Sequence, residues 1–239
     1  MKSLAYLSSK LLLIKNDTFK KKITTFFLSV LFLLLVIVVW GLILKIIDVI
    51  FIKQNNYSLI DFLKNKQSNR IFSQSYYLNI IKIIIAAPIL EEIAYRLPLN
   101  LKKNTVIISL ITFCAIYLGD NVFSLSLYSL GTWLKFGAIL LIALFGYFYI
   151  KQSFLNKFKD RFYNVYFYLL ALLFAADHIS IYITHLPSKL LILAPLFIIP
   201  QFLLALTTGY VRMKNGILWA ILLHMAFNTP TVLNYIYST

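Results

Sequence analysis

Two adjacent carboxylates stand inside an apolar stretch of the chain, in the segment 87–96, APILEEIAYR. An ionised side chain near the centre of a bilayer costs roughly 2.5–3.5 kcal/mol on the insertion scale, so it requires a partner or a function. Glu92 and Arg96 are four residues apart, which places them on one face of a helix and predicts that they pair. Glu91 diverges from Glu92 by about 100° around the helix, so we expect the two carboxylates to face different partners. Glu91 is then the candidate general base; alternatively, the cluster only reaches the lipid headgroups from a helix end.

Two later segments carry polar side chains within apolar sequence. His178 follows Phe174 by four residues, and Asn228 follows His224 by four residues on one helical face. A single histidine in a helix is more often packed against neighbouring backbone than catalytic. Because lipid offers no hydrogen-bond partners, polar groups from three separate segments are expected to meet inside the bundle.

The composition defines the class of protein that must position these groups. Of 239 residues, 61% are hydrophobic and 13% are charged, whereas soluble domains average about 25% charged residues. The net charge of +15 is distributed in short lysine clusters between apolar runs, which positive-inside topology explains without nucleic-acid binding. The single cysteine, Cys114, excludes an internal disulfide framework and a multi-cysteine metal site, and we expect it to serve packing.

The apolar runs predict an all-α polytopic transmembrane helix bundle of about seven spans with the N-terminus in the cytoplasm. We expect residues 1–22 to form a basic arm on the membrane surface and residues 23–239 to form one transmembrane domain. A surface or re-entrant helix in the polar connection 48–74 would raise the number of spans to eight. Pro88 is expected to kink the second span and Pro98 to end it. The expected spans are 23–47, 75–97, 105–118, 132–150, 163–184, 190–211 and 216–235.

Three motifs, in this order, resemble those of the CPBP intramembrane proteases, also called the CAAX protease and bacteriocin-processing or Abi family. They are Glu-Glu-x-x-x-Arg at 91–96, preceded by Pro88, then Phe-x-x-x-His at 174–178 and His-x-x-x-Asn at 224–228. Gln201, Gly209 and Gly216 also fit the usual approach to the third motif. The resemblance covers about residues 78–229 and leaves the arm and the first span unmatched.

The resemblance implies an all-helical endopeptidase that cleaves a membrane-associated peptide or protein, in what we expect to be a bacterial plasma membrane. Carried onto this chain, it makes Glu91 the general base, and the rest of the site is formed by His178, His224 and Asn228. Glu92 and Arg96 would brace the site. No cofactor is expected.

Other functions remain open from the sequence. A zinc ion held by Glu91, His178 and His224, with water as the fourth ligand, is a less favoured version of the same hydrolysis. A non-catalytic immunity or regulatory protein of the same fold, binding a peptide or another membrane protein, is the main alternative. A proton relay or transporter is disfavoured because the sequence has no evident inverted repeat. Asp177 precedes His178 where the family more often has an apolar or small residue, and it should point toward another span or water.

Overall fold

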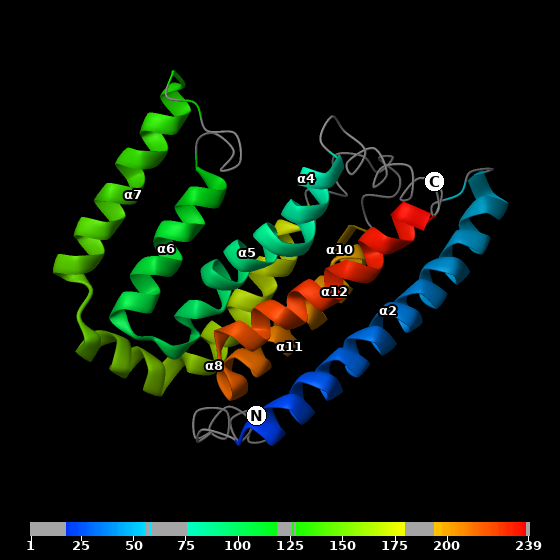
Figure 1. Cartoon of the computed structure of the whole chain (residues 1–239), viewed down its shortest axis with the longest axis horizontal. Helices are drawn as coiled ribbons and strands as arrows, with labels where there is room; N and C mark the ends of the chain where they lie inside the picture. The colour runs from blue at the N-terminus through cyan, green and yellow to red at the C-terminus, as the bar shows by residue number, and fades with distance from the viewer. Residues whose placement is uncertain are drawn as a thin grey trace.

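The computed structural model describes residues 18–55, 58, 76–118, 126, 128–179 and 194–237. Within these ranges the chain folds into helices and contains no β-strand, so the all-helical fold class is confirmed for them (Figure 1). Most of the basic arm, most of the connection 48–74, and His185, which directly follows the expected span 163–184, lie outside the described residues.

Among the described residues, three helical stretches are long and apolar enough to cross a membrane: Phe19–Ile50, Leu130–Tyr149 and Ala194–Asn215. The first lies within α2 (Phe19–Asn55), the second is α7 (Leu130–Tyr149), and the third joins α10 (Ala194–Phe197) to α11 (Ile199–Asn215). Two further apolar helices are shorter, at Lys103–Tyr117 and Ile217–Pro230. These helices indicate a membrane protein. The count of seven spans stays a prediction.

The helices pack as a bundle whose centre is formed by segments far apart in the sequence. α11 packs against α2, α8 (Gln152–Asp177) and α12 (Ile217–Tyr237), while α5 (Ala87–Tyr95) packs against α12 and α6 (Lys103–Tyr117). α6 and α7 form a hairpin on one flank, and α2 runs along the opposite flank (Figure 1). Side chains from α2, α5, α8, α11 and α12 meet in the main core. Examples, one from each helix in that order, are Leu33, Ala94, Phe174, Leu204 and Leu223.

The segment before the two carboxylates changes its helical pitch. α4 (Tyr76–Ile81) continues into a π-helix at Lys82–Ala86 and then into α5. The π-type hydrogen bond runs from the Ala87 amide to the Lys82 carbonyl oxygen. A wider turn at this point is physically reasonable because Pro88 has no amide hydrogen for the ladder. After α5, a 3₁₀ helix at Leu97–Asn100 contains Pro98, so the predicted end of the helix is confirmed.

α8 differs from the expected span 163–184. The helix begins at Gln152 and ends at Asp177, so the basic residues that predict a loop lie instead within its first half. Leu155 and Tyr163, two helical turns apart, are buried there against Leu101. Because α8 ends at Asp177, Phe174 lies buried in its last turn and His178 caps its C-terminal end.

Candidate active site

The candidate site is built around the ring of Phe174, which is completely buried. Four side chains contact this ring from two other helices and from its own. Its centroid lies 5.5 Å from the ring centroid of Tyr95, 4.8 Å from that of His178 and 5.6 Å from that of His224. The guanidinium carbon of Arg96 lies 4.0 Å from the same centroid. Phe174 is therefore the shared packing surface of the motifs, a role that its motif position alone did not indicate.

His224 lies between the two carboxylates of α5. Its Nδ1 is 2.9 Å from Oε1 of Glu92, and its Nε2 is 3.6 Å from Oε2 of Glu91. The expectation that Glu91 and Glu92 face different partners is therefore wrong. The 100° divergence holds at the backbone, but an imidazole carries a nitrogen on each edge, and two long side chains reach both edges.

The two glutamates differ in their access to solvent. The Glu91 side chain is 23% exposed, whereas Glu92 is 0% exposed and His224 is 2% exposed. Of the two, Glu91 is therefore the carboxylate that a water molecule or a substrate can reach, and Glu92 holds the imidazole from behind.

Arg96 compensates the charge of Glu92, as its spacing predicted. Its Nε lies 3.5 Å from Oε2 of Glu92, and it donates a hydrogen bond of 3.0 Å to Oγ1 of Thr208 on α11. Nη1 and Nη2 of Arg96 make no hydrogen bond within the described part of the chain; the guanidinium instead lies against the Phe174 ring in a cation–π contact. Sequence reasoning missed Thr208, although a hydroxyl on a buried helical face is a signal for such a contact.

His178 is fixed by its own helix rather than by the carboxylates. Its Nδ1 lies 2.9 Å from the carbonyl oxygen of Phe174. Since a carbonyl oxygen only accepts, Nδ1 must donate, which leaves the lone pair of the neutral imidazole on Nε2. Among the described residues no hydrogen bond joins His178 to Glu91, His224 or Asn228; it reaches the site through its contact with Phe174.

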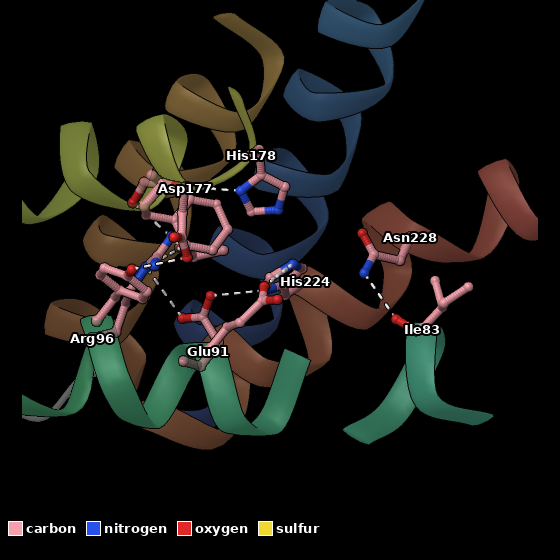
Figure 2. A network of polar contacts seen from close by, with 12 residues as sticks. Ile83, Glu91, Arg96, Asp177, His178, His224 and Asn228 are labelled. Carbon is pink, nitrogen blue, oxygen red and sulfur yellow. Dashed lines mark hydrogen bonds and ion pairs between the residues drawn. The ribbon is translucent and has the colours of Figure 1, made fainter. Parts of the chain in front are cut away.

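Asn228 contacts the π-helix one turn beyond His224. Its Nδ2 donates a 3.0 Å hydrogen bond to the carbonyl oxygen of Ile83 (Figure 2). That oxygen is open to Asn228 because the Ala87 amide is bonded to Lys82 and the next amide position is Pro88. The amide group of Asn228 has a second hydrogen, which the Ile83 contact does not use.

Asp177 faces another helix, one of the two options that its helical angle allowed. Its Oδ2 accepts a 3.1 Å hydrogen bond from the hydroxyl of Tyr95, which is also 3.1 Å from the hydroxyl of Tyr117. This contact links the end of α8, which carries His178, to α5, which carries the carboxylates. Sequence reasoning missed Tyr95, although a tyrosine beside the motif arginine needs a partner for its hydroxyl when buried.

The zinc alternative needs three ligands that converge. Among the described residues, no group of three or more His, Cys, Asp or Glu side chains is arranged to hold a metal ion. Glu91 and His224 are adjacent, but His178 does not complete a set with them. The donor set thus does not fit a three-ligand zinc site, and we derive no step through a metal.

Comparisons of the chain with protein-family models, with curated proteins and with solved structures find no match. The resemblance to the CPBP proteases therefore depends on the three motifs themselves.

Proposed function

We propose that the protein is an intramembrane endopeptidase of the CPBP type, which hydrolyses a membrane-associated peptide or protein with a water activated by Glu91. The observation that supports this most directly is the alignment of Glu91, His224 and Glu92 across one imidazole, at 3.6 Å and 2.9 Å. In this arrangement the buried Glu92 holds one edge of the imidazole, and the solvent-exposed Glu91 can exchange a proton with the nitrogen on the other edge.

The proton path follows from these contacts. His224 donates Nδ1–H to the Glu92 carboxylate, so the neutral imidazole presents the lone pair of Nε2 toward Glu91. Glu91 removes a proton from water as the hydroxide oxygen bonds to the peptide carbonyl carbon. The proton then passes to Nε2 and from there to the leaving amine as the C–N bond breaks. The products are a carboxyl terminus and a free amine, and no acyl-enzyme is formed.

The remaining polar groups of the site have separate roles: some bind the reacting peptide, and others hold Glu92 in place. The second amide hydrogen of Asn228 is the donor that we assign to the developing oxyanion. His178 has its lone pair on Nε2, so as a neutral imidazole it accepts a hydrogen bond, for example from a substrate amide, rather than stabilising the oxyanion. Arg96 and Thr208 keep Glu92 in place behind His224.

The test is the substitution Glu91→Gln, which keeps the size of the side chain and removes its basicity. The purified protein is reconstituted in lipid vesicles with a library of membrane-associated peptides, and new peptide termini are detected by mass spectrometry. Loss of a general base typically costs about 10²–10⁴-fold, so we expect kcat/KM to fall by that order. Asp160→Asn, on an exposed position of α8, is the matched control and should keep full activity.

Proteolysis that is unchanged in Glu91→Gln would eliminate the proposal. Full biological activity with all four site residues replaced would instead identify the non-catalytic regulatory alternative. These residues are Glu91, His178, His224 and Asn228.

A further inference from the structure

A groove of about 420 Å³ runs between α2 and α11, separate from the residues of the candidate active site. Both walls follow a helical repeat. Thr25, Ser29 and Phe32 line it from α2, and Leu203, Thr207 and Tyr210 line it from α11. Leu28 of α2, which also lines the groove, is 61% exposed, so the groove opens at the surface of the bundle. In a membrane this surface faces lipid.

The walls of the groove are largely apolar, although they contain three aliphatic hydroxyl groups besides the phenol of Tyr210. Thr25 donates to the Lys21 carbonyl at 2.9 Å, Ser29 donates to the Thr25 carbonyl at 2.8 Å, and Thr207 donates to the Leu203 carbonyl at 2.7 Å. Each hydroxyl is thus satisfied by its own helix, and methyl, isobutyl and ring groups form the surface. An apolar groove that faces a bilayer is suited to an acyl chain, because an unfilled space there would lose dispersion contacts.

One end of the groove is positively charged. Lys214 lines it directly, and its Nζ donates a 3.2 Å hydrogen bond to the hydroxyl of Tyr210. On α2, Lys21 lies one turn before Thr25 on the same helical face. The two helix ends are adjacent, since Nδ2 of Asn215 donates a 2.8 Å hydrogen bond to the Lys22 carbonyl.

The two helices carry basic rather than acidic side chains at this end. α11 contains neither Asp nor Glu, and the first turn of α2 has no acidic residue. By the positive-inside rule, this end lies at the cytoplasmic leaflet, which carries the anionic lipids.

We propose that the groove between α2 and α11 binds one anionic phospholipid of the bilayer, with an acyl chain along the apolar walls and the phosphate between Lys21 and Lys214. The apolar walls match the acyl chain of such a lipid, and the cationic end matches its headgroup. A zwitterionic lipid has no net negative charge, so it would gain less from the two lysines.

The first experiment tests the charge. The protein is purified in detergent, phosphatidylglycerol or phosphatidylcholine is added at equal concentration, and native mass spectrometry measures the affinity of the first bound lipid. A lysine near the surface contributes about 1 kcal/mol toward anionic lipid, so two lysines correspond to a preference of roughly 30-fold. The double variant Lys21→Gln/Lys214→Gln should lose most of this preference. The matched pair Lys151→Gln/Lys157→Gln, exposed on and beside α8, should keep it.

The second experiment tests the groove with the lysines intact. Thr207→Trp places an indole in the groove and should lower the affinity for both lipids. Thr24→Trp makes the same change at an exposed position of α2 that does not line the groove, and should leave the affinity unchanged. The proposal is overturned if the anionic preference survives in Lys21→Gln/Lys214→Gln, if both lysine pairs lower it equally, or if Thr207→Trp binds lipid as the parent protein does. None of these measurements depends on proteolysis, so they stand apart from the proposed function.

Discussion

The buried pair of Arg96 and Glu92 provides a test of what stabilises the bundle. The two sources to be distinguished are the compensation of buried charge and ordinary hydrogen bonding. The side chains are 2% and 0% exposed, and the Nε to Oε2 distance is 3.5 Å. Arg96→Met removes the guanidinium and leaves the Glu92 carboxylate without its cation. If compensation of buried charge dominates, this should cost about 3–5 kcal/mol of unfolding free energy. If the loss of the hydrogen bond from Arg96 to Thr208 on α11 dominates instead, the cost should be closer to 0.6 kcal/mol, roughly the average for hydrogen bonds between helices in a bilayer.

We expect the larger value, because neither charged group has water to replace its partner. A double-mutant cycle with Glu92→Gln separates the interaction energy between Arg96 and Glu92 from the energy lost with the Arg96–Phe174 contact. This is possible because the double variant contains neither charge. The double variant should recover about 2 kcal/mol or more relative to the sum of the single variants.

The unfolding free energy is measured by titration with sodium dodecyl sulfate in mixed micelles, followed by tryptophan fluorescence. Arg161→Met, at an exposed position of α8, is the matched control and should not move the midpoint. A cost for Arg96→Met below about 1 kcal/mol, together with a coupling energy near zero, would refute the reasoning from buried charge.

Two further variants test the packing around the site by the same titration. Tyr95→Phe removes the donor to Asp177 and should cost about 1 kcal/mol; an unchanged midpoint would show that this hydrogen bond does not hold α8 to α5. Gly209→Ala would place a Cβ 2.9 Å from Cε2 of Phe167 and should destabilise by about 1–3 kcal/mol. Gly137→Ala, where nothing lies within 4 Å, should instead stabilise by up to about 1 kcal/mol, and equal effects of the two alanines would contradict the steric argument.

The pairing of Glu92 with Arg96 was predictable because it lies within one helix, where spacing fixes geometry. The proximity of Glu91 to His224 followed from a different principle, namely that lipid leaves polar groups no partner outside the bundle. That principle predicts that polar groups meet, but it does not predict which atoms meet.

Contacts that depend on side-chain reach or on small changes of backbone pitch were not predictable. The bond from Glu92 to His224 required knowing how an imidazole lies across two helical faces. The contacts of Thr208 and Tyr95 join helices distant in sequence, and no local pattern encodes their register. The charge density in the first half of α8 predicts a loop and outweighs a weak amphipathic repeat, in which Leu155 and Tyr163 are buried.

The missing amide hydrogen of Pro88 has a mechanical consequence for substrate access. It leaves the Ile83 carbonyl to Asn228, while His224, one turn earlier on α12, is held by Glu92. α12 is thereby fastened to the α4–α5 segment at two points, one on each side of the proline, and can neither slide nor rotate without breaking both. If the proposed function holds, a peptide that reaches Glu91 would have to arrive along a route that leaves this pair of contacts closed.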